Sequence, residues 1–167
     1  NNECNEAWYT WGWRDRYFKK TEVGGKVWEQ YTRLYNKILP EVVSKFSPGT
    51  FYWPSSPFSR HGAPSKENIG DRHFWDVWGG EKSIDTYLTA RSRFFSEYGF
   101  QSFPDIETIK RYAPNKSDWN IYSEVMMSHQ RAGINANKKI ETYLIDEFGK
   151  PHDFQSFLYM NQLLQGD

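Results

Sequence analysis

Residues 93–99 of the chain read RFFSEYG, an apolar run that ends on a charged side chain, a tyrosine and a glycine. Aromatic residues such as Phe94 and Phe95 are typical of a strand, and we predict one over residues 93–97. Glu97 ends this predicted strand, where a carboxylate is costly to bury unless it is paired or hydrogen-bonded. Catalytic groups of parallel α/β folds lie where strands end and loops begin, so Glu97 is a candidate functional residue. Solvated acids also occupy strand ends, and position alone does not separate the two interpretations.

Two further strands are predicted upstream of this one. Residues 50–53 (TFYW) are short, aromatic and bounded by a proline, and residues 73–78 (HFWDVW) stop at two glycines. The segment 54–72 between them is rich in Pro, Ser and Gly, and a loop of that length is usually functional or disordered. A short helix over 84–90 is expected to lead into the strand at 93–97.

The rest of the chain has the apolar spacing of helices. Residues 27–39 are predicted as one helix, and Pro40 is expected to start a second that ends near Phe46. After Pro104 the cap residues predict four more helices: one from Asp105 to about Tyr112, one from Ser117 to about Met127, one from Asn135 ending before Gly149, and one from Asp153. Strands that alternate with helices indicate βα units and a parallel sheet, in one domain or a piece of one.

Composition excludes several classes of protein. The 167 residues carry 21 basic and 21 acidic side chains, and this zero net charge argues against a dedicated nucleic-acid binder. No apolar run approaches the ~18–20 residues that a membrane span needs. Cys4 is the single cysteine and cannot form an internal disulfide. The four histidines, His61, His73, His129 and His152, lack ligand spacing, so no metal site is predicted.

Aromatic residues are unusually frequent. The chain has 8 Trp, 11 Tyr and 12 Phe, which together make 19% of its residues. They could form a large aromatic core, or they could line a wet cleft of the kind that stacks on sugar rings. Composition alone leaves both interpretations open.

Four motifs carry a resemblance to a known family. Residues 1–3 (NNE), followed by 6–8 (EAW), resemble the acid/base motif of glycoside hydrolase family 2. Residues 96–102 (SEYGFQS) resemble the nucleophile motif of its β-mannosidase branch. Residues 52–57 (YWPSSP) and 70–78 (GDRHFWDVW) also resemble that branch, and the motifs follow one another in the family's order. The resemblance covers essentially the whole chain.

The resemblance implies an α/β fold, namely part of a (β/α)₈ TIM barrel. The chain would run from the tip of strand four through the helix after strand seven, with strands five, six and seven at 50–53, 73–78 and 93–97. Residues 1–167 would then belong to one catalytic barrel domain whose two ends are cuts through a larger fold. The remaining barrel strands and the β-sandwich domains of the parent chain would be its partners.

The resemblance also implies a chemistry, that of a retaining exo-acting hydrolase that releases terminal β-D-mannose from β-mannoside oligosaccharides or glycans. In its double displacement, Glu97 would be the nucleophile and Glu3 the acid/base, two carboxyl groups only ~5–5.5 Å apart. Expected substrate contacts are Asn2 to the sugar 2-hydroxyl, aromatic walls from Trp53, Trp75 and Trp78, Tyr98 beside the nucleophile, and hydroxyl contacts from His73 or Asp71. Each of the three tryptophans has core packing as its alternative role, and packing is the expected role of Trp8, Trp11, Trp13 and Trp28. No cofactor, nucleic acid or membrane is implied.

Two other functions remain open at this point. A sister specificity of the same family, β-galactosidase or β-glucuronidase, would be revealed by a screen of aryl glycosides. A non-catalytic carbohydrate-binding fragment would still bind sugar after the loss of both Glu3 and Glu97. Because catalytic groups must be held within about half an ångström, we expect the isolated 167-residue chain to be inactive.

Overall fold

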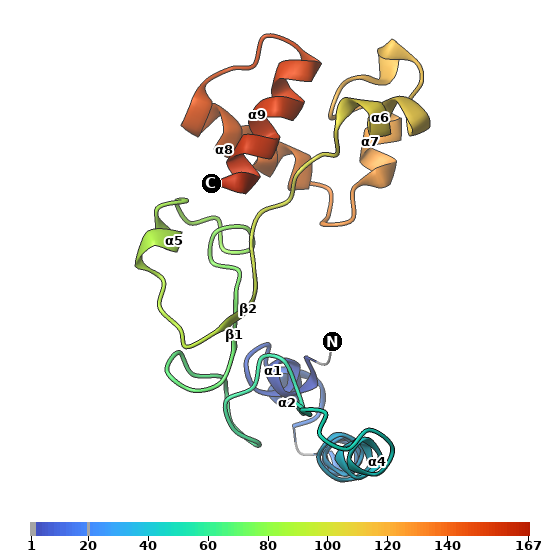
Figure 1. Cartoon of the computed structure of the whole chain (residues 1–167), viewed down its shortest axis with the longest axis vertical. Coiled ribbons are helices and arrows are strands. Elements are labelled where there is room, and N and C mark those ends of the chain that lie inside the picture. Colours follow the sequence, from blue (N-terminus) through green and yellow to red (C-terminus); the bar gives the residue numbers. More distant parts are fainter. Residues whose placement is uncertain (1–2, 20) are drawn as a thin grey trace. The chain divides into compact units, whose positions relative to one another are not determined.

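The computed structural model describes residues 3–19 and 21–167, and it divides into two compact units, Asn1–Tyr98 and Gly99–Asp167. The structure is mixed α/β, with many helices and one parallel pair of strands in the described residues (Figure 1). The expected α/β class is therefore confirmed. Among the described residues, no helix has the length and apolar character to cross a membrane.

The first unit begins with helices, α1 (Cys4–Tyr9), α2 (Trp13–Tyr17) and α3 (Glu22–Arg33). Helix α3 continues through a π-helical turn, η1 (Leu34–Ile38), directly into α4 (Leu39–Phe46). The helix predicted to start at Pro40 and end near Phe46 is confirmed as α4, with Pro40 in its first turn, although the backbone enters it from η1 without interruption. Pro40 has no N–H and its ring crowds the preceding turn. The π turn accommodates this, because the Leu39 N–H donates to the Leu34 carbonyl five residues back.

The two strands are β1 (Arg72–Phe74) and β2 (Phe95–Tyr98), joined by a crossover that contains α5 (Thr86–Thr89). They pair in parallel, as the alternating pattern predicted, with His73 beside Glu97 and Phe74 beside Tyr98. Strand β1 ends earlier than the predicted residue 78, because the Trp75 carbonyl accepts the N–H groups of Gly79 and Gly80 in a turn. A Cβ on Gly79 would lie 2.8 Å from that carbonyl oxygen, so glycine is required here.

The strand predicted at 50–53 is not formed in the described residues. Side chains hold this segment instead: the Tyr52 hydroxyl donates to the Tyr35 carbonyl at 2.6 Å, and the Trp53 indole N–H donates to Asp71 Oδ1 at 2.9 Å. Aromatic propensity and the bounding proline were the local basis for the prediction, and a strand also requires a neighbour for its backbone groups.

Aromatic rings form much of the packing in the first unit. Trp8 stacks on Phe18 and on Trp28, and Trp28 also contacts Tyr31. The expected packing role of Trp8 and Trp28 is confirmed. Trp11 and Trp13, for which packing was also expected, remain exposed and meet edge to face. Part of the aromatic excess is therefore core, and part is surface.

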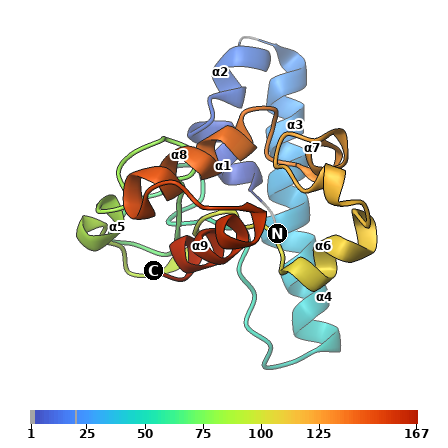
Figure 2. The same ribbon diagram turned by 90° about the horizontal axis from the view of Figure 1, so that it is seen from above.

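The second unit is helical: α6 (Ile106–Tyr112), a 3₁₀ turn η2 (Lys116–Asp118), α7 (Glu124–His129), α8 (Ala136–Phe148) and α9 (Phe154–Gly166). Helices α8 and α9 lie side by side in both views (Figure 2). Asp105 and Asp153 cap α6 and α9 as predicted.

The helix predicted from Ser117 was wrong. Ser117 lies in the 3₁₀ turn, and Ser123 caps α7 by accepting the Met126 N–H at 3.2 Å. Both serines match the cap pattern, and the turn at 119–123 decides between them. There the Trp119 indole N–H donates to the Ala113 carbonyl, which directs the chain away from an early helix.

Candidate functional site

Three carboxylates of the first unit converge on one histidine nitrogen. His73 Nδ1 lies 3.3 Å from Glu3 Oε1, 3.4 Å from Glu6 Oε2 and 3.3 Å from Glu97 Oε2. We call these four residues the His73 cluster. The sequence suggested Glu3, His73 and Glu97 separately, and the structure brings them together. Asn2, the expected contact to a sugar 2-hydroxyl, lies outside the described residues.

Strand register and helix geometry explain this convergence. His73 and Glu97 are paired across β1 and β2, and paired residues direct their side chains to the same face. Glu3 is the N-cap of α1 and Glu6 lies three residues later, which places both on one side of the helix. Sequence reasoning missed Glu6 as a site residue, although its three-residue spacing from Glu3 was the available signal.

The histidine is buried and its two nitrogens face different partners. Its side chain is only 1% exposed. Nε2 lies 3.1 Å from the Ser56 hydroxyl, whereas Nδ1 makes no hydrogen bond with the described residues. The three carboxylate oxygens approach Nδ1 at distances beyond the usual 2.7–3.2 Å of an N–H···O bond, about 0.1–0.2 Å too long. Close electrostatic contact without a hydrogen bond therefore characterises this nitrogen.

Glu6 has the most perturbed carboxyl group of the cluster. Burial, together with the charges of Glu3, Glu97 and Asp71, raises the pKa of Glu6 from 4.5 to about 7. Its side chain is 13% exposed, so water screens these repulsions weakly. A carboxyl group that holds its proton up to neutral pH thus lies next to the two acids that the sequence singled out.

Asp71 supports the cluster through Ser56, whose hydroxyl contacts both Asp71 and His73 Nε2. It is 5% exposed and accepts four hydrogen bonds: from the Trp53 indole at 2.9 Å, the Ser56 hydroxyl at 2.7 Å, the Phe58 N–H at 2.7 Å and the Ser96 hydroxyl at 2.5 Å. Burial raises its pKa, but these hydrogen bonds outweigh burial, so the net pKa of Asp71 is lowered. Protein donors thus occupy the carboxylate that the sequence suggested as a sugar contact.

The separation of the proposed acid pair is short. One carboxylate oxygen of Glu3, one of Glu97 and His73 Nδ1 all lie within 4.8 Å of one another. These three atoms are also the group, within the described part of the chain, that could hold a metal ion. Histidine spacing in the sequence gave no sign of such a group, because its members come from three separate segments.

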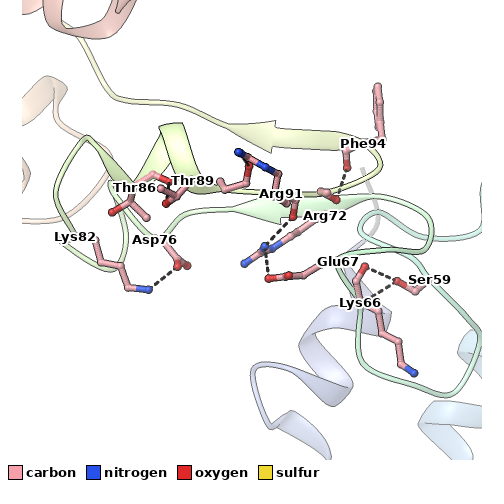
Figure 3. A network of polar contacts seen from close by, with 12 residues as sticks. Ser59, Lys66, Glu67, Arg72, Asp76, Lys82, Thr86, Thr89, Arg91 and Phe94 are labelled. Carbon is pink, nitrogen blue, oxygen red and sulfur yellow. Dashed lines mark hydrogen bonds and ion pairs between the residues drawn. The ribbon is translucent and has the colours of Figure 1, made fainter.

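A cleft of about 520 Å³ opens beside the cluster, and its lining includes Glu3, Glu6, His73, Trp11 and Trp75. Ion pairs flank β1 near this cleft: Arg72 with Glu67, and Lys82 with Asp76 (Figure 3). Trp75 is the expected aromatic residue that shares the cleft with Glu3 and Glu6, and Trp11 was expected only to pack. The site thus combines acids and aromatic faces in one recess.

The other predicted aromatic residues lie elsewhere. Trp53 lines a separate open cleft of about 430 Å³ with Tyr35 and Ser56. Trp78 is half-buried in the turn that follows β1. Tyr98 is exposed, and its ring meets Tyr87 and Phe95 edge-on, since neighbouring strand residues such as Glu97 and Tyr98 point to opposite faces.

Comparisons with known proteins place the chain among relatives of one kind. No protein-family model matches it. It is 36% identical over 135 residues to "Beta-mannosidase B" of Aspergillus terreus and 33% identical over 135 residues to that of Aspergillus niger. A crystal structure of beta-D-mannosidase from Dictyoglomus thermophilum matches with a TM-score of 0.72 and 32% identity.

Each of these matches covers 80% of this chain but only 16% of the relative. The chain is therefore homologous to a segment of the β-mannosidases, and its structure is similar to part of one. The resemblance drawn from the four sequence motifs is confirmed at this level.

Proposed function

We propose that this chain is part of the catalytic (β/α)₈ barrel of a retaining exo-β-mannosidase, with Glu97 as nucleophile and Glu3 as acid/base. The observation that carries the proposal is the approach of their carboxylate oxygens to within 4.8 Å. Retaining glycosidases hold their two carboxyl groups about 5–5.5 Å apart, whereas inverting enzymes leave about 6.5–9.5 Å for a water molecule. The short separation therefore supports retention of configuration.

In the proposed first step, Glu97 attacks the anomeric carbon while Glu3 donates a proton to the leaving oxygen. The bond between sugar and aglycone breaks, and a covalent glycosyl-enzyme forms on Glu97. In the second step, Glu3 removes a proton from water, whose oxygen attacks the anomeric carbon and releases Glu97 as a carboxylate. Each carboxylate returns to its starting protonation state.

His73 and Glu6 are proposed to position this acid pair. Nδ1 of His73 is 3.3 Å from an oxygen of each catalytic acid, and the imidazole is too buried to present itself to a sugar. Glu6 stays largely protonated below its pKa of about 7, which limits the negative charge that Glu3 and Glu97 must tolerate. We therefore assign His73 to the acids in preference to the substrate hydroxyls first expected from the resemblance.

The mannoside substrate class is proposed from the relatives, because their names state β-mannosidase activity. Trp75 is the proposed aromatic wall, since it lines the same cleft as Glu3 and Glu6. Asn2 is proposed to bind the sugar 2-hydroxyl. Roles for Trp53, Trp78 and Tyr98 at the sugar site remain predictions that depend on barrel elements supplied by a longer polypeptide.

The proposal is tested by Glu97→Ala in the enzyme that carries the complete barrel. Turnover of an aryl β-mannoside should fall by several orders of magnitude, and added azide should restore part of it by replacing the nucleophile and yielding the α-glycosyl azide. Glu107→Ala, which removes an exposed acid paired with Lys110, is the matched control and should leave turnover unchanged. Wild-type turnover by Glu97→Ala would refute the assignment, and hydrolysis of only aryl galactosides or glucuronides would refute the mannoside specificity.

A further inference from the structure

The hydrogen bonds that Ser56 makes with Asp71 and His73 determine which nitrogen of a neutral His73 ring carries the hydrogen. Ser56 has one hydroxyl hydrogen, and Asp71, a carboxylate, can only accept it, at 2.7 Å. The Ser56 oxygen must then accept from His73 Nε2, which lies 3.1 Å away. In the neutral imidazole the hydrogen therefore lies on Nε2, and the lone pair of Nδ1 faces the carboxyl groups of Glu3, Glu6 and Glu97.

A lone pair that faces the carboxylates of Glu3 and Glu97 is an unfavourable arrangement unless a proton or a metal cation lies between them. The imidazole is 1% exposed, and Nδ1 has no hydrogen-bond partner among the described residues, so water does not relieve this repulsion. We propose that the His73 cluster contains a site for one divalent zinc ion, with protein ligands from His73 Nδ1, Glu3 and Glu97.

The distances agree with tetrahedral coordination. Zinc binds nitrogen and carboxylate oxygen at about 2.0–2.1 Å, which corresponds to ligand–ligand edges of about 3.3–3.4 Å in a tetrahedron. The edges from His73 Nδ1 to the oxygens of Glu3 and Glu97 are 3.3 Å each. The oxygens of Glu3 and Glu97 are within 4.8 Å of each other, so small rotations of these partly exposed side chains would close the edge between them.

The donor set selects the type of cation. Calcium and magnesium prefer shells made of oxygen alone, whereas an imidazole nitrogen combined with carboxylates suits zinc. The Ser56–Asp71 pair also provides what metal-bound histidines usually have, a hydrogen-bond partner for the other ring nitrogen. Zinc at this place would occupy the lone pairs of both proposed catalytic acids. Inhibition of turnover by zinc therefore rests on the proposed function, whereas binding itself does not.

Calorimetric titration of the 167-residue chain with zinc chloride tests the proposal, in a buffer that does not bind metals. We expect one zinc ion per chain, and at least about a tenfold weaker binding in Glu3→Gln and in Glu97→Gln, the range that loss of even outer-shell partners produces. His73→Gln should abolish binding. Cobalt(II) in place of zinc should give the intense visible absorption of tetrahedral coordination.

Three variants serve as matched controls. Glu107→Gln and His152→Gln change an exposed acid and an exposed histidine outside the cluster, and Cys4→Ser removes a thiol next to Glu3 that could itself bind zinc. All three should bind zinc as the wild type does. Circular dichroism checks that each variant is folded, and if His73→Gln is not, the two Glu→Gln variants decide.

The proposal is overturned if the chain binds no zinc, if Glu3→Gln and Glu97→Gln bind it with wild-type affinity, or if Cys4→Ser abolishes binding. None of these results affects the azide rescue of Glu97→Ala. Conversely, wild-type turnover by Glu97→Ala would refute the catalytic assignment and leave zinc binding intact.

Discussion

Removal of the Asp71 carboxylate should destabilise the first unit more than any exposed substitution. Asp71 is nearly buried and accepts four hydrogen bonds, and bonds to a charged acceptor contribute about 1.5–3 kcal/mol each in isolation. These contributions do not add, because the Ser56 and Ser96 hydroxyls can turn toward each other across 3.3 Å and the Trp53 indole can reach water. The Phe58 N–H is left without its acceptor. We expect Asp71→Ala to lose about 3–5 kcal/mol of unfolding free energy.

Asp71→Asn separates the effect of charge from the effect of shape. The amide oxygen can still accept from Trp53 and Phe58, and the amide nitrogen can donate to the two serine oxygens. We therefore expect this variant to lose only about 1–2 kcal/mol. Because the pKa of Asp71 is lowered by folding, the stability that ionised Asp71 contributes is present above its unfolded pKa, about 3.9, and is lost as the pH falls through the lower folded value. The wild type should therefore lose its advantage over Asp71→Asn in acid.

Urea unfolding monitored by tryptophan fluorescence suits this measurement, since every tryptophan except Trp119 lies in the first unit. Asp85→Ala, at an exposed acid that makes no cap bond, is the control and should stay within about 0.5 kcal/mol of the wild type. If Asp71→Ala also stays within that range at neutral pH, the four hydrogen bonds do not hold the loop to β2, and the account of the site's support is refuted.

Three further predictions concern other parts of the structure. Folding raises the pKa of Glu6 from 4.5 to about 7, so the unfolding free energy of the wild type should fall by on the order of 2–3 kcal/mol as the pH rises between these values. Glu6→Gln should flatten this part of a stability profile measured by urea unfolding, and an unchanged slope would contradict the burial of Glu6. Ser123→Ala should lower the unfolding free energy by about 1 kcal/mol because it removes the α7 cap, whereas Ser117→Ala should lower it by less than about 0.5 kcal/mol. The opposite order in thermal unfolding would support a helix that starts at Ser117. Gly25→Ala should stabilise α3 by about 0.5–1 kcal/mol, because nothing lies within 4 Å of the added Cβ. Gly24→Ala should destabilise α3, because its Cβ would lie 2.6 Å from a backbone oxygen, and equal effects of the two variants in the same assay would rule out this close approach.

Local signals in the sequence predicted the elements whose stability is local. Asp105 and Asp153 cap their helices where the pattern placed them, because a cap requires only backbone groups two or three residues away. The parallel pairing of the strands around residues 73 and 95 also followed from the alternation of strands and helices. The strand at 50–53 could not be judged in this way, because pairing depends on a neighbour that sequence pattern does not specify.

The site was predicted only in part, for the same reason. Glu3 and Glu97 were singled out by motif and strand position, and their approach could not be measured from the sequence. Glu6 was not predicted as a site residue because its raised pKa results first from burial, which its three-residue spacing from Glu3 does not reveal. The cluster around His73 Nδ1 draws on α1, β1 and β2, so no linear spacing of ligands could reveal it.

The backbone pairing of β1 with β2 also determines where the chain can change in length. Their register, with its irregularity between Arg72 and His73, sets His73 opposite Glu97, and the connecting segment 75–94 contributes no residue to the His73 cluster. Insertions or deletions within exposed parts of that connection, such as the stretch around residues 81–83, should leave the two side chains where they are. One residue added inside either strand would rotate His73 or Glu97 to the opposite face of the pair. Length variants in natural or engineered sequences should therefore accumulate in the crossover and be excluded from the strands.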